Sequence, residues 1–353
     1  MKEHCYAEIS LSRFKTNVIR AKTYLAGKAR LMVAVKSNAY GHGGAQLARA
    51  ALEAGADGLA VLDIPTGLKL RSVSETTPLL CWLHSPQSDF GEAARVDLDI
   101  GVSAIWQLAE IEKQAPKKEV KVHLKIDTGL HRNGALAEDW PALVERAKKM
   151  ESNGHIRVVG IWSHLSDTSI EENKISLERF QAAVEAAKEQ GVEAEIHHVA
   201  ASMAALEQPD SRLDMVRVGI IAYGVSPLTD RRAEELGFLP VMSVRAEVLE
   251  CRRKEGEALI GMGFADGLLP PASGQGWIRH KSAKFSIKSV DADQLTIGTA
   301  DSENLPSEGE FVTLWGDPEE DCPRAEDWAR WAGTIGDEVV TSVADRVPRH
   351  FIE

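Results

Sequence analysis

The sequence predicts an α/β protein in which an N-terminal (β/α)8 TIM barrel is followed by a C-terminal, mostly-β domain. Up to about residue 225, eight short apolar runs alternate with segments of helical period. This alternation is typical of a parallel sheet covered by helices on both faces. Eight such units in about 200 residues fit the barrel, and a doubly wound sheet is the alternative. Beyond about residue 227, β-type runs separated by turn residues predominate.

The elements can be placed in order along the chain. The eight barrel strands are expected at 31–35, 58–62, 78–83, 98–102, 120–126, 158–163, 194–199 and 215–222, with helical patterns at 44–54, 140–150 and 172–190. The second domain is expected to have strands at 242–251, 283–289, 294–299 and 310–315 and one helix at 325–332. Residues 5–10 alternate with period two and could add a strand to it. We therefore expect domains at 1–228 and 229–353, with residues 1–10 able to join the second.

Composition excludes several classes of function. The net charge of -12 disfavours nucleic-acid binding, which depends on cationic contacts with phosphate. The four cysteines are scattered without metal-ligand spacing, as in a cytoplasmic protein with reduced thiols. Apolar runs are too short to span a membrane, and the N-terminus does not resemble a signal peptide. We expect a cytoplasmic protein that acts on small molecules.

The most informative segment is LMVAVKSNAYGHG at 31–43, where an apolar strand runs directly into Lys36. A lysine at the end of a buried strand is costly unless chemistry uses its amine. Burial lowers the pKa of a lysine, and a neutral amine is the nucleophile that forms Schiff bases. From these residues alone, Lys36 is either a covalent anchor for an aldehyde or a lysine on the surface.

Further polar or small residues fall at the carboxyl ends of the predicted strands, where the active site of such a barrel lies. Each alone is weak evidence, because an Asp–Arg pair is often structural and a lone His or Ser usually has no chemical role. Together they predict one site, in which the loops after the seventh and eighth strands could hold a phosphate. The candidates are Lys36, Lys125, Asp127, Arg132, His164, Ser202, Arg217, Gly219 and Ile220.

The string AVKSNAYGHG closely resembles the pyridoxal-phosphate lysine segment of the alanine racemase family, and similar segments continue to RVPR at 346–349. The resemblance implies pyridoxal 5'-phosphate as cofactor, a small amino acid as substrate and a head-to-tail homodimer. It also implies a role for each matching position. Lys36 would be the Schiff-base lysine and the base on the D face. The phosphate would be held by Tyr40, Ser202, Gly219 and Ile220, and the pyridine ring would lie above His164 and Arg217. Arg132 would contact the phenolate and the substrate carboxylate, and Lys125 matches a lysine that is often carbamylated.

Arg217 would tune the cofactor in this arrangement. An arginine does not give up its proton, so it would leave the pyridine nitrogen unprotonated and weaken the ring as an electron sink. That tuning favours simple removal of an α-proton over reactions that need a long-lived carbanion.

The chain departs from the family where the partner subunit normally contributes. The family's second base is a tyrosine about twenty residues before an I-G-Y-A-D-G-like string, but EGEALIGMGFADG at 255–267 omits that segment. The four tyrosines are Tyr6, Tyr24, Tyr40 and Tyr223, all before the β domain. Other differences are Phe264 for the tyrosine of the string, Ala292 for the substrate-facing methionine of a C-M-D string, and Asp345 before RVPR.

Three hypotheses follow. The first is a pyridoxal-phosphate amino-acid racemase, with alanine as the default substrate and Asp266, Asp293 or water as the substitute acid. The second is an enzyme with the same cofactor and Lys36 as its one base, such as a decarboxylase or lyase of specialised biosynthesis. The third is a non-enzymatic pyridoxal-phosphate-binding protein, which the length of the β domain disfavours.

Overall fold

The computed structural model describes residues 4–281 and 283–353. The chain divides into two compact units. The barrel unit comprises Val18–Lys36 and Ala51–Gly219, and the β unit comprises Met1–Asn17, Ser37–Ala50 and Ile220–Glu353. The predicted boundary between residues 228 and 229 stays a prediction.

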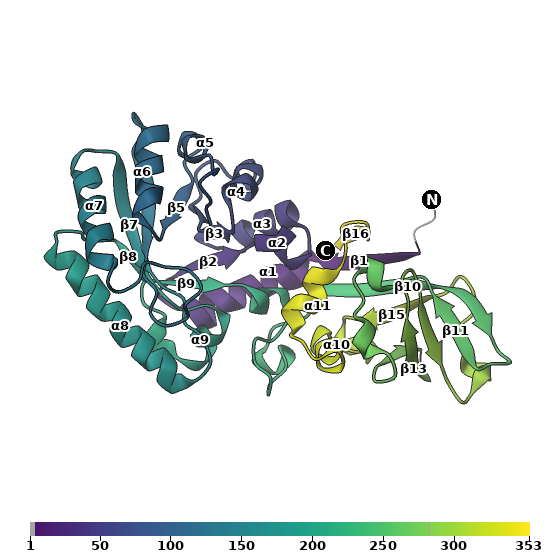
Figure 1. The fold of residues 1–353 in the computed structure, drawn as a ribbon. Coiled ribbons are helices and arrows are strands. Elements are labelled where there is room, and N and C mark those ends of the chain that lie inside the picture. The colour runs from purple at the N-terminus through teal and green to yellow at the C-terminus, as the bar shows by residue number, and fades with distance from the viewer. Residues whose placement is uncertain (1–3, 282) are drawn as a thin grey trace. The chain divides into compact units, whose positions relative to one another are not determined.

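The barrel unit is built on eight parallel strands in the order β8-β7-β6-β5-β4-β3-β2-β9 (Figure 1). Two backbone hydrogen bonds join the ends of this order, from Asp214 N to His197 O at 3.1 Å and from Arg217 N to Ala200 O at 3.1 Å, so the barrel closes. The predicted (β/α)8 barrel is confirmed. The strands are β2 (Arg30–Ala34), β3 (Gly58–Val61), β4 (Leu79–Cys81), β5 (Asp99–Val102), β6 (Val120–Lys125), β7 (Ile156–Trp162), β8 (Ile196–His198) and β9 (Met215–Val218).

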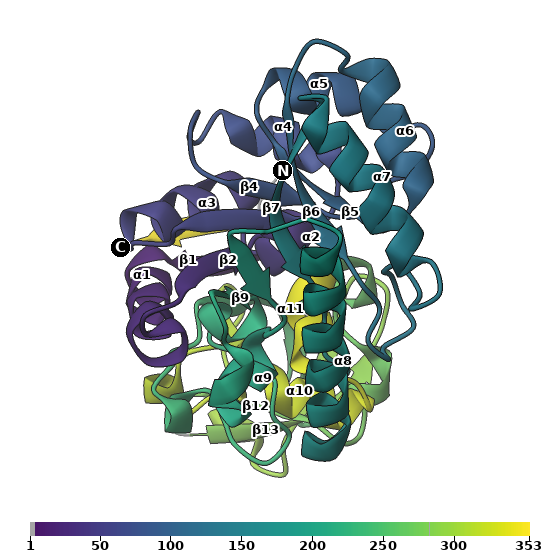
Figure 2. The same ribbon diagram turned by 90° about the vertical axis from the view of Figure 1, so that its left-hand side faces the viewer.

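Helices cover the outside of these strands (Figure 2). The longest is α8, where the Ser169 side chain accepts a hydrogen bond from Glu172 N at 3.1 Å and so caps the first turn. The helices are α4 (Ile64–Arg71), α5 (Phe90–Arg95), α6 (Ile105–Gln114), α7 (Trp140–Ser152), α8 (Ile170–Glu189) and α9 (Ser202–Glu207), while α1 (Leu11–Arg20), α2 (Lys36–Tyr40) and α3 (Gly44–Glu53) have residues in both units.

Several strands are shorter than predicted, and the last barrel strand shows why. The apolar run expected as a strand at 215–222 leaves the sheet at Val218, and Ile220–Tyr223 forms a 3-10 turn. All four residues of that turn are buried. A fully buried turn is as apolar as a strand, so the sequence pattern alone does not separate them.

The β unit contains a ring of antiparallel strands, β10-β11-β14-β13-β12-β15, because β10 pairs with both β11 and β15. Strand β1 adds antiparallel to β10, and β16 adds parallel to β1. The strand expected at 5–10 is thus present. The bounds are β1 (Cys5–Ser10), β10 (Met242–Arg252), β11 (Glu257–Ile260), β12 (Trp277–His280), β13 (Ala283–Val290), β14 (Leu295–Gly298), β15 (Phe311–Trp315) and β16 (Arg349–Ile352).

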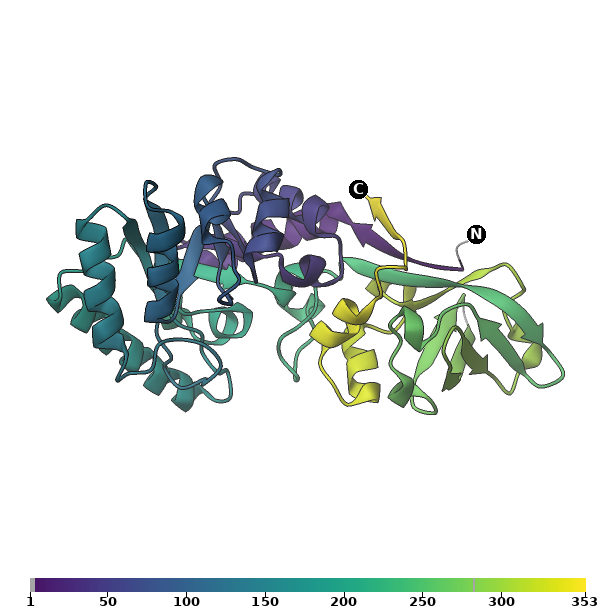
Figure 3. The same ribbon diagram turned by 45° about the horizontal axis from the view of Figure 1, so that its top comes forward.

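Two helices pack in this unit, and Figure 3 shows them in yellow: α10 (Ala325–Ala332) and α11 (Gly336–Ser342). Trp328 Nε1 donates to Leu314 O on β15 at 2.9 Å, and its ring lies 5.8 Å from that of Trp331. The predicted helix at 325–332 and the packing role of its tryptophans are confirmed. The sequence reading missed α11 and three of the strands, β11, β12 and β16, which are seven residues or shorter.

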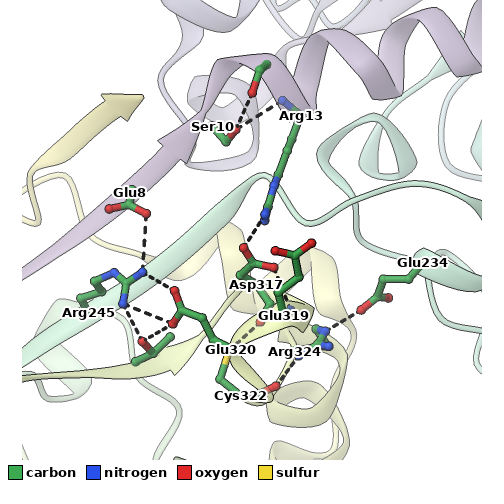
Figure 4. Close-up of polar contacts among 12 residues, drawn as sticks. Glu8, Ser10, Arg13, Glu234, Arg245, Asp317, Glu319, Glu320, Cys322 and Arg324 are labelled. Atoms are coloured by element: carbon green, nitrogen blue, oxygen red, sulfur yellow. Dashed lines mark hydrogen bonds and ion pairs between the residues drawn. The ribbon is translucent and has the colours of Figure 1, made fainter. Parts of the chain in front are cut away.

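Ion pairs connect the N-terminal strand β1 and the first turn of α1 with the segment after β15 (Figure 4). Arg245 lies between Glu320 at 2.5 Å and Glu8 at 3.6 Å. Arg13 pairs with Asp317. These pairs are partly exposed, so each adds at most about 1 kcal/mol, and their main effect is to fix register.

Candidate active site

Lys36 is separated from the end of β2 by Val35 alone and is half-buried. The four residues that follow it, Ser37 to Tyr40, all have φ between 50° and 55°. A left-handed turn costs roughly 1–2 kcal/mol per non-glycine residue, so four in succession must be held by their surroundings. The Asn38 side chain accepts from Gly44 N at 2.7 Å and closes the turn. The correction to the sequence reading is that Lys36 stands in front of a strained turn rather than at the strand's last position.

His164 marks the place where the predicted site residues of the barrel meet. Burial and the neighbouring cations hold the pKa of His164 well below its usual value. The cations, in order of effect, are Arg217, Arg132, Lys125 and Lys36. The structure therefore gathers four basic side chains, from β2, β6 and β9 or the loops that follow them, around one neutral imidazole.

Arg217 on β9 is held from several sides, although it lies in the barrel core. One guanidinium nitrogen donates to His198 Nδ1 at 2.7 Å. The other donates to Ser163 O at 2.9 Å and Val199 O at 3.0 Å, and lies 3.3 Å from His164 Nδ1. Burial lowers the pKa of Arg217, but a guanidinium keeps its proton at neutral pH. Its position is therefore fixed, and it acts as a permanent donor.

The hydrogen bonds of Arg217 continue into a chain of imidazoles inside the barrel. Because Arg217 can only donate, His198 Nδ1 must be the acceptor, and the single proton of neutral His198 lies on Nε2. That nitrogen lies 2.9 Å from His123 Nδ1 and donates to it. A neutral His123 then carries its proton on Nε2, which lies 3.7 Å from Asp99 Oδ2.

The sequence reading missed His123 and His198. Both are buried side chains on barrel strands, His123 on β6 and His198 on β8. The alternation of residues on β6 could have revealed His123. His123 and Lys125 alternate with apolar residues on this strand, so both side chains face the barrel interior.

Lys125 is buried beside Trp162, with its Nζ 4.4 Å from the ring centre. The Arg217 guanidinium lies 5.0 Å from the same ring. Burial, followed by repulsion from Arg217 and Arg132, lowers the pKa of Lys125 to about 7. A large fraction of this amine is therefore neutral and nucleophilic at physiological pH.

The loop after β6 that carries Arg132 is built around Asp127. The Asp127 carboxylate accepts from Gly129 N at 2.9 Å and His131 N at 3.1 Å. Thr128 is bonded to Ser163 at 2.9 Å, which ties the loop to the end of β7. Arg132 itself is exposed. The predicted Asp127 therefore shapes the loop, while Arg132 can reach a ligand.

The residues predicted for the phosphate are divided between the units. In the barrel unit, Gly219 N donates to Ser202 Oγ at 3.0 Å, and both residues are buried. Ile220 follows in the chain and begins the 3-10 turn. Tyr40 belongs to the β unit, where its ring lies 5.0 Å from that of Tyr223.

The segment that the sequence reading predicted to lack the second base lies in the β unit, where β11 ends at Ile260 and a 3-10 turn (Phe264–Asp266) follows. Ala265 N donates to Ala292 O at 3.0 Å, which joins the turn to the predicted substrate-facing position. Both candidate acids bond to Arg346, Asp266 at 2.8 Å and Asp293 at 3.1 Å.

Comparison with known proteins decides the family. The Alanine racemase, N-terminal domain model matches residues 9–227, and the Alanine racemase, C-terminal domain model matches residues 246–351. The chain belongs to the alanine racemase family. Alanine racemase from Beutenbergia cavernae is 36% identical over 97% of this chain and 96% of its own. That from Salinispora tropica is 34% identical over 92% of each chain. The structure of alanine racemase from Streptomyces lavendulae is 34% identical, with a TM-score of 0.95 over 100% of this chain and 98% of its own.

The donor set suits the cofactor expected in an alanine racemase. Pyridoxal phosphate and an amino-acid substrate bring a phosphate, a phenolate and a carboxylate, and the barrel offers four cations around one neutral imidazole. The described residues hold no group of three or more His, Cys, Asp or Glu side chains that could bind a metal. Across that same described part, no helix is both long and apolar enough to cross a membrane.

Proposed function

We propose that this protein is a pyridoxal-phosphate-dependent amino-acid racemase with alanine as its substrate. The observation that carries the proposal is the gathering of Lys36, Lys125, Arg132 and Arg217 around neutral His164 at the carboxyl end of the barrel strands. Membership of the alanine racemase family supports the same reaction.

Lys36 is the anchor and one base. When bound, the cofactor supplies an aldehyde carbon that bonds to amines and a ring that withdraws electrons from the α-carbon. The Lys36 amine would hold the cofactor through that aldehyde carbon, and its Nζ would take or return the α-proton of the substrate on one face. The strained turn from Ser37 to Tyr40 fixes where this amine starts.

Arg217 and His164 set how strongly the ring withdraws electrons. Arg217 presents a guanidinium that donates and does not release its proton, so it would leave the ring nitrogen of the cofactor unprotonated. Its bonds to His198, Ser163 and Val199 hold it in place. A weak electron sink favours racemisation, in which the proton returns at once, over reactions that need a persistent carbanion.

The carboxylate of the substrate and the phenolate and phosphate of the cofactor have cationic or hydrogen-bond-donating partners. Arg132 would bind the substrate carboxylate and the cofactor phenolate. Lys125, with a pKa of about 7, is suited to carbamylation by carbon dioxide, which would turn a cation beside Arg132 into an anion that orients it. Tyr40, Ser202, Gly219 and Ile220 would hold the phosphate, and Ala292 would lie near the substrate.

The second face lacks the family's tyrosine, since all four tyrosines precede residue 224. Loss of a positioned acid or base typically slows a reaction by roughly 10²–10⁴-fold. The bonds of Asp266 and Asp293 to Arg346 engage both carboxylates and favour water as the substitute. The engagement of both carboxylates by Arg346 also favours a second candidate function. This is a one-base enzyme, such as a decarboxylase or lyase, in which Lys36 alone moves protons.

Assembly and location follow the family. We propose a cytoplasmic homodimer in which residues 1–228 bind the cofactor and residues 229–353 of the partner complete the entrance.

The test uses the cofactor-loaded protein with each alanine enantiomer in deuterated water. Uptake of deuterium at the α-carbon with inversion supports the racemase. Uptake with retention would reject the racemase and favour the one-base enzyme. Lack of uptake with either enantiomer, while other amino acids exchange, would reject alanine as the substrate.

A further inference from the structure

A cavity of about 120 Å³ opens at the amino ends of the barrel strands, on the opposite side of the barrel from His164 and Lys36. Its apolar wall is formed by Met32, Ile196 and Met215. The volume is that of about four molecules of liquid water. Barrel interiors of this type are normally filled by side chains, so a space of this size needs an occupant.

Asp99, at the start of β5, lines this cavity and is 4% exposed. Its Oδ1 is buried without any hydrogen bond. The nearest cation, Lys121 Nζ, is 3.6 Å away and donates instead to Asp97 at 2.8 Å. His123 Nε2 is 3.7 Å from the other oxygen. A buried carboxylate oxygen without a hydrogen bond is costly, so Asp99 Oδ1 can accept one from a donor inside the cavity.

The rim of the cavity carries exposed charges of both signs. Arg30 and Arg157 are the cations, and Asp57 and Glu195 are the anions. Asp57 already accepts from Leu31 N at 2.6 Å. The arginines are therefore the available partners for an anionic group, while Asp99 is the available partner for a cationic one.

We propose that this cavity binds a small α-amino acid as its zwitterion, with the ammonium on Asp99 and the carboxylate on Arg30 and Arg157. An ammonium supplies the donors that Asp99 lacks. A zwitterion also suits the balanced charges of the lining better than a net cation does. The side chain of the ligand lies against Met32 and Met215.

The ligand would act on the far end of the barrel through the imidazole chain. His123 faces Asp99 on one side and accepts from His198 on the other, and His198 accepts from Arg217. Neutralising the charge of Asp99 with an ammonium weakens the polarisation of this chain. This coupling rests on the proposed function, whereas binding itself does not.

Binding is tested on the full, cofactor-loaded protein labelled with ¹⁵N in its imidazoles, titrated with glycine, ethylammonium and acetate. The expected result is a saturable shift of the His123 resonances by glycine in the millimolar range, with binding by the two half-probes weaker by about tenfold. Equal binding of ethylammonium would overturn the zwitterion assignment. Absence of a saturable shift with glycine would leave water as the occupant and overturn the site.

Variants separate this cavity from the cofactor site. Asp99→Asn is expected to weaken glycine binding by about tenfold or more, because it removes the charge but keeps the shape. Arg30→Ala with Arg157→Ala changes only exposed residues, and should weaken glycine binding while leaving ethylammonium unchanged. Glu193→Gln, at the same end but outside the lining, should change neither. Shifts that persist undiminished in both the Asp99 and the arginine variants would overturn the proposal.

The cofactor absorbance gives a readout independent of activity. N,N-dimethylglycine, a zwitterion whose tertiary amine cannot bond to the cofactor aldehyde, should shift the absorbance of the bound cofactor in the wild type and not in Asp99→Asn. Binding without that shift would overturn the coupling and leave the site standing. A protein that binds glycine on Asp99 but takes up no cofactor would reject the proposed function instead.

Discussion

Arg217 donates a hydrogen bond to His198 at 2.7 Å, and this bond fixes the tautomer of two buried imidazoles, because the proton of His198 is directed at His123. The guanidinium at the base of the site is therefore supported by groups that no ligand touches. This support is what keeps Arg217 a donor in one position.

Replacing His198 with leucine should lower the free energy of unfolding by about 1–3 kcal/mol, because a buried guanidinium loses an acceptor. Cofactor affinity should fall as well. The matched control is His197→Leu, on the same strand but half-exposed, whose pair with Asp214 adds at most about 1 kcal/mol. Denaturant unfolding and cofactor titration measure both effects, and equal losses in the two variants would contradict the supporting role.

A methyl group at residue 160 should disrupt the hydrogen bond between His123 and His198. A Cβ on Gly160 would lie 2.2 Å from His123 Nδ1, so the ring must move away from His198. Gly160→Ala is expected to destabilise the fold by about 1–3 kcal/mol. The ¹⁵N resonances of His123 and His198 should change together, and an unchanged His198 would show that the two rings are not coupled.

Lys125 should react with carbon dioxide in a pH-dependent manner. Only the neutral amine adds carbon dioxide, and burial with nearby arginines lowers the pKa of Lys125 to about 7. The carbamate should therefore form above pH 7 and disappear as the pH falls below it. Carbon-13 NMR with labelled bicarbonate measures this, and Lys125→Arg is the control. A signal that survives in Lys125→Arg would place the carbamate elsewhere.

His42 should make stability depend on pH. Burial lowers its pKa from 6.5 to about 4, so the folded protein keeps it neutral while the unfolded chain takes up a proton first. Its contribution is fully present above pH 6.5 and is lost as the pH falls to 4, by up to about 3 kcal/mol. His42→Asn should flatten the slope of unfolding free energy over this interval. An identical slope in the variant would show that other groups cause it.

Much of the barrel could be predicted because its strands are apolar runs of regular spacing, and helix 325–332 because it pairs two tryptophans at helical spacing. The turn after Lys36 could not, because left-handed φ at Ser37, Ala39 and Tyr40 contradicts the local preference of those residues and is imposed by the surrounding structure. The strained turn is also the kind of feature found at functional sites.

The sequence draws attention to some residues of the candidate site and not to others. Lys125 and His164 stand where an apolar run meets polar residues, and Arg217 is a charged residue inside an apolar run. His123 and His198 sit within the barrel, where a lone histidine is indistinguishable from a packed core residue until its partner is known. Their pairing joins residues 75 positions apart, which no local pattern reveals.

The central claim is that Lys36 holds the cofactor. Borohydride reduction of the loaded protein, followed by peptide mass spectrometry, tests it most directly. The account predicts a pyridoxyl-phosphate addition on Lys36 and its loss, together with the visible absorbance band, in Lys36→Ala. A modified Lys125, or an absorbance band that persists in Lys36→Ala, would contradict it.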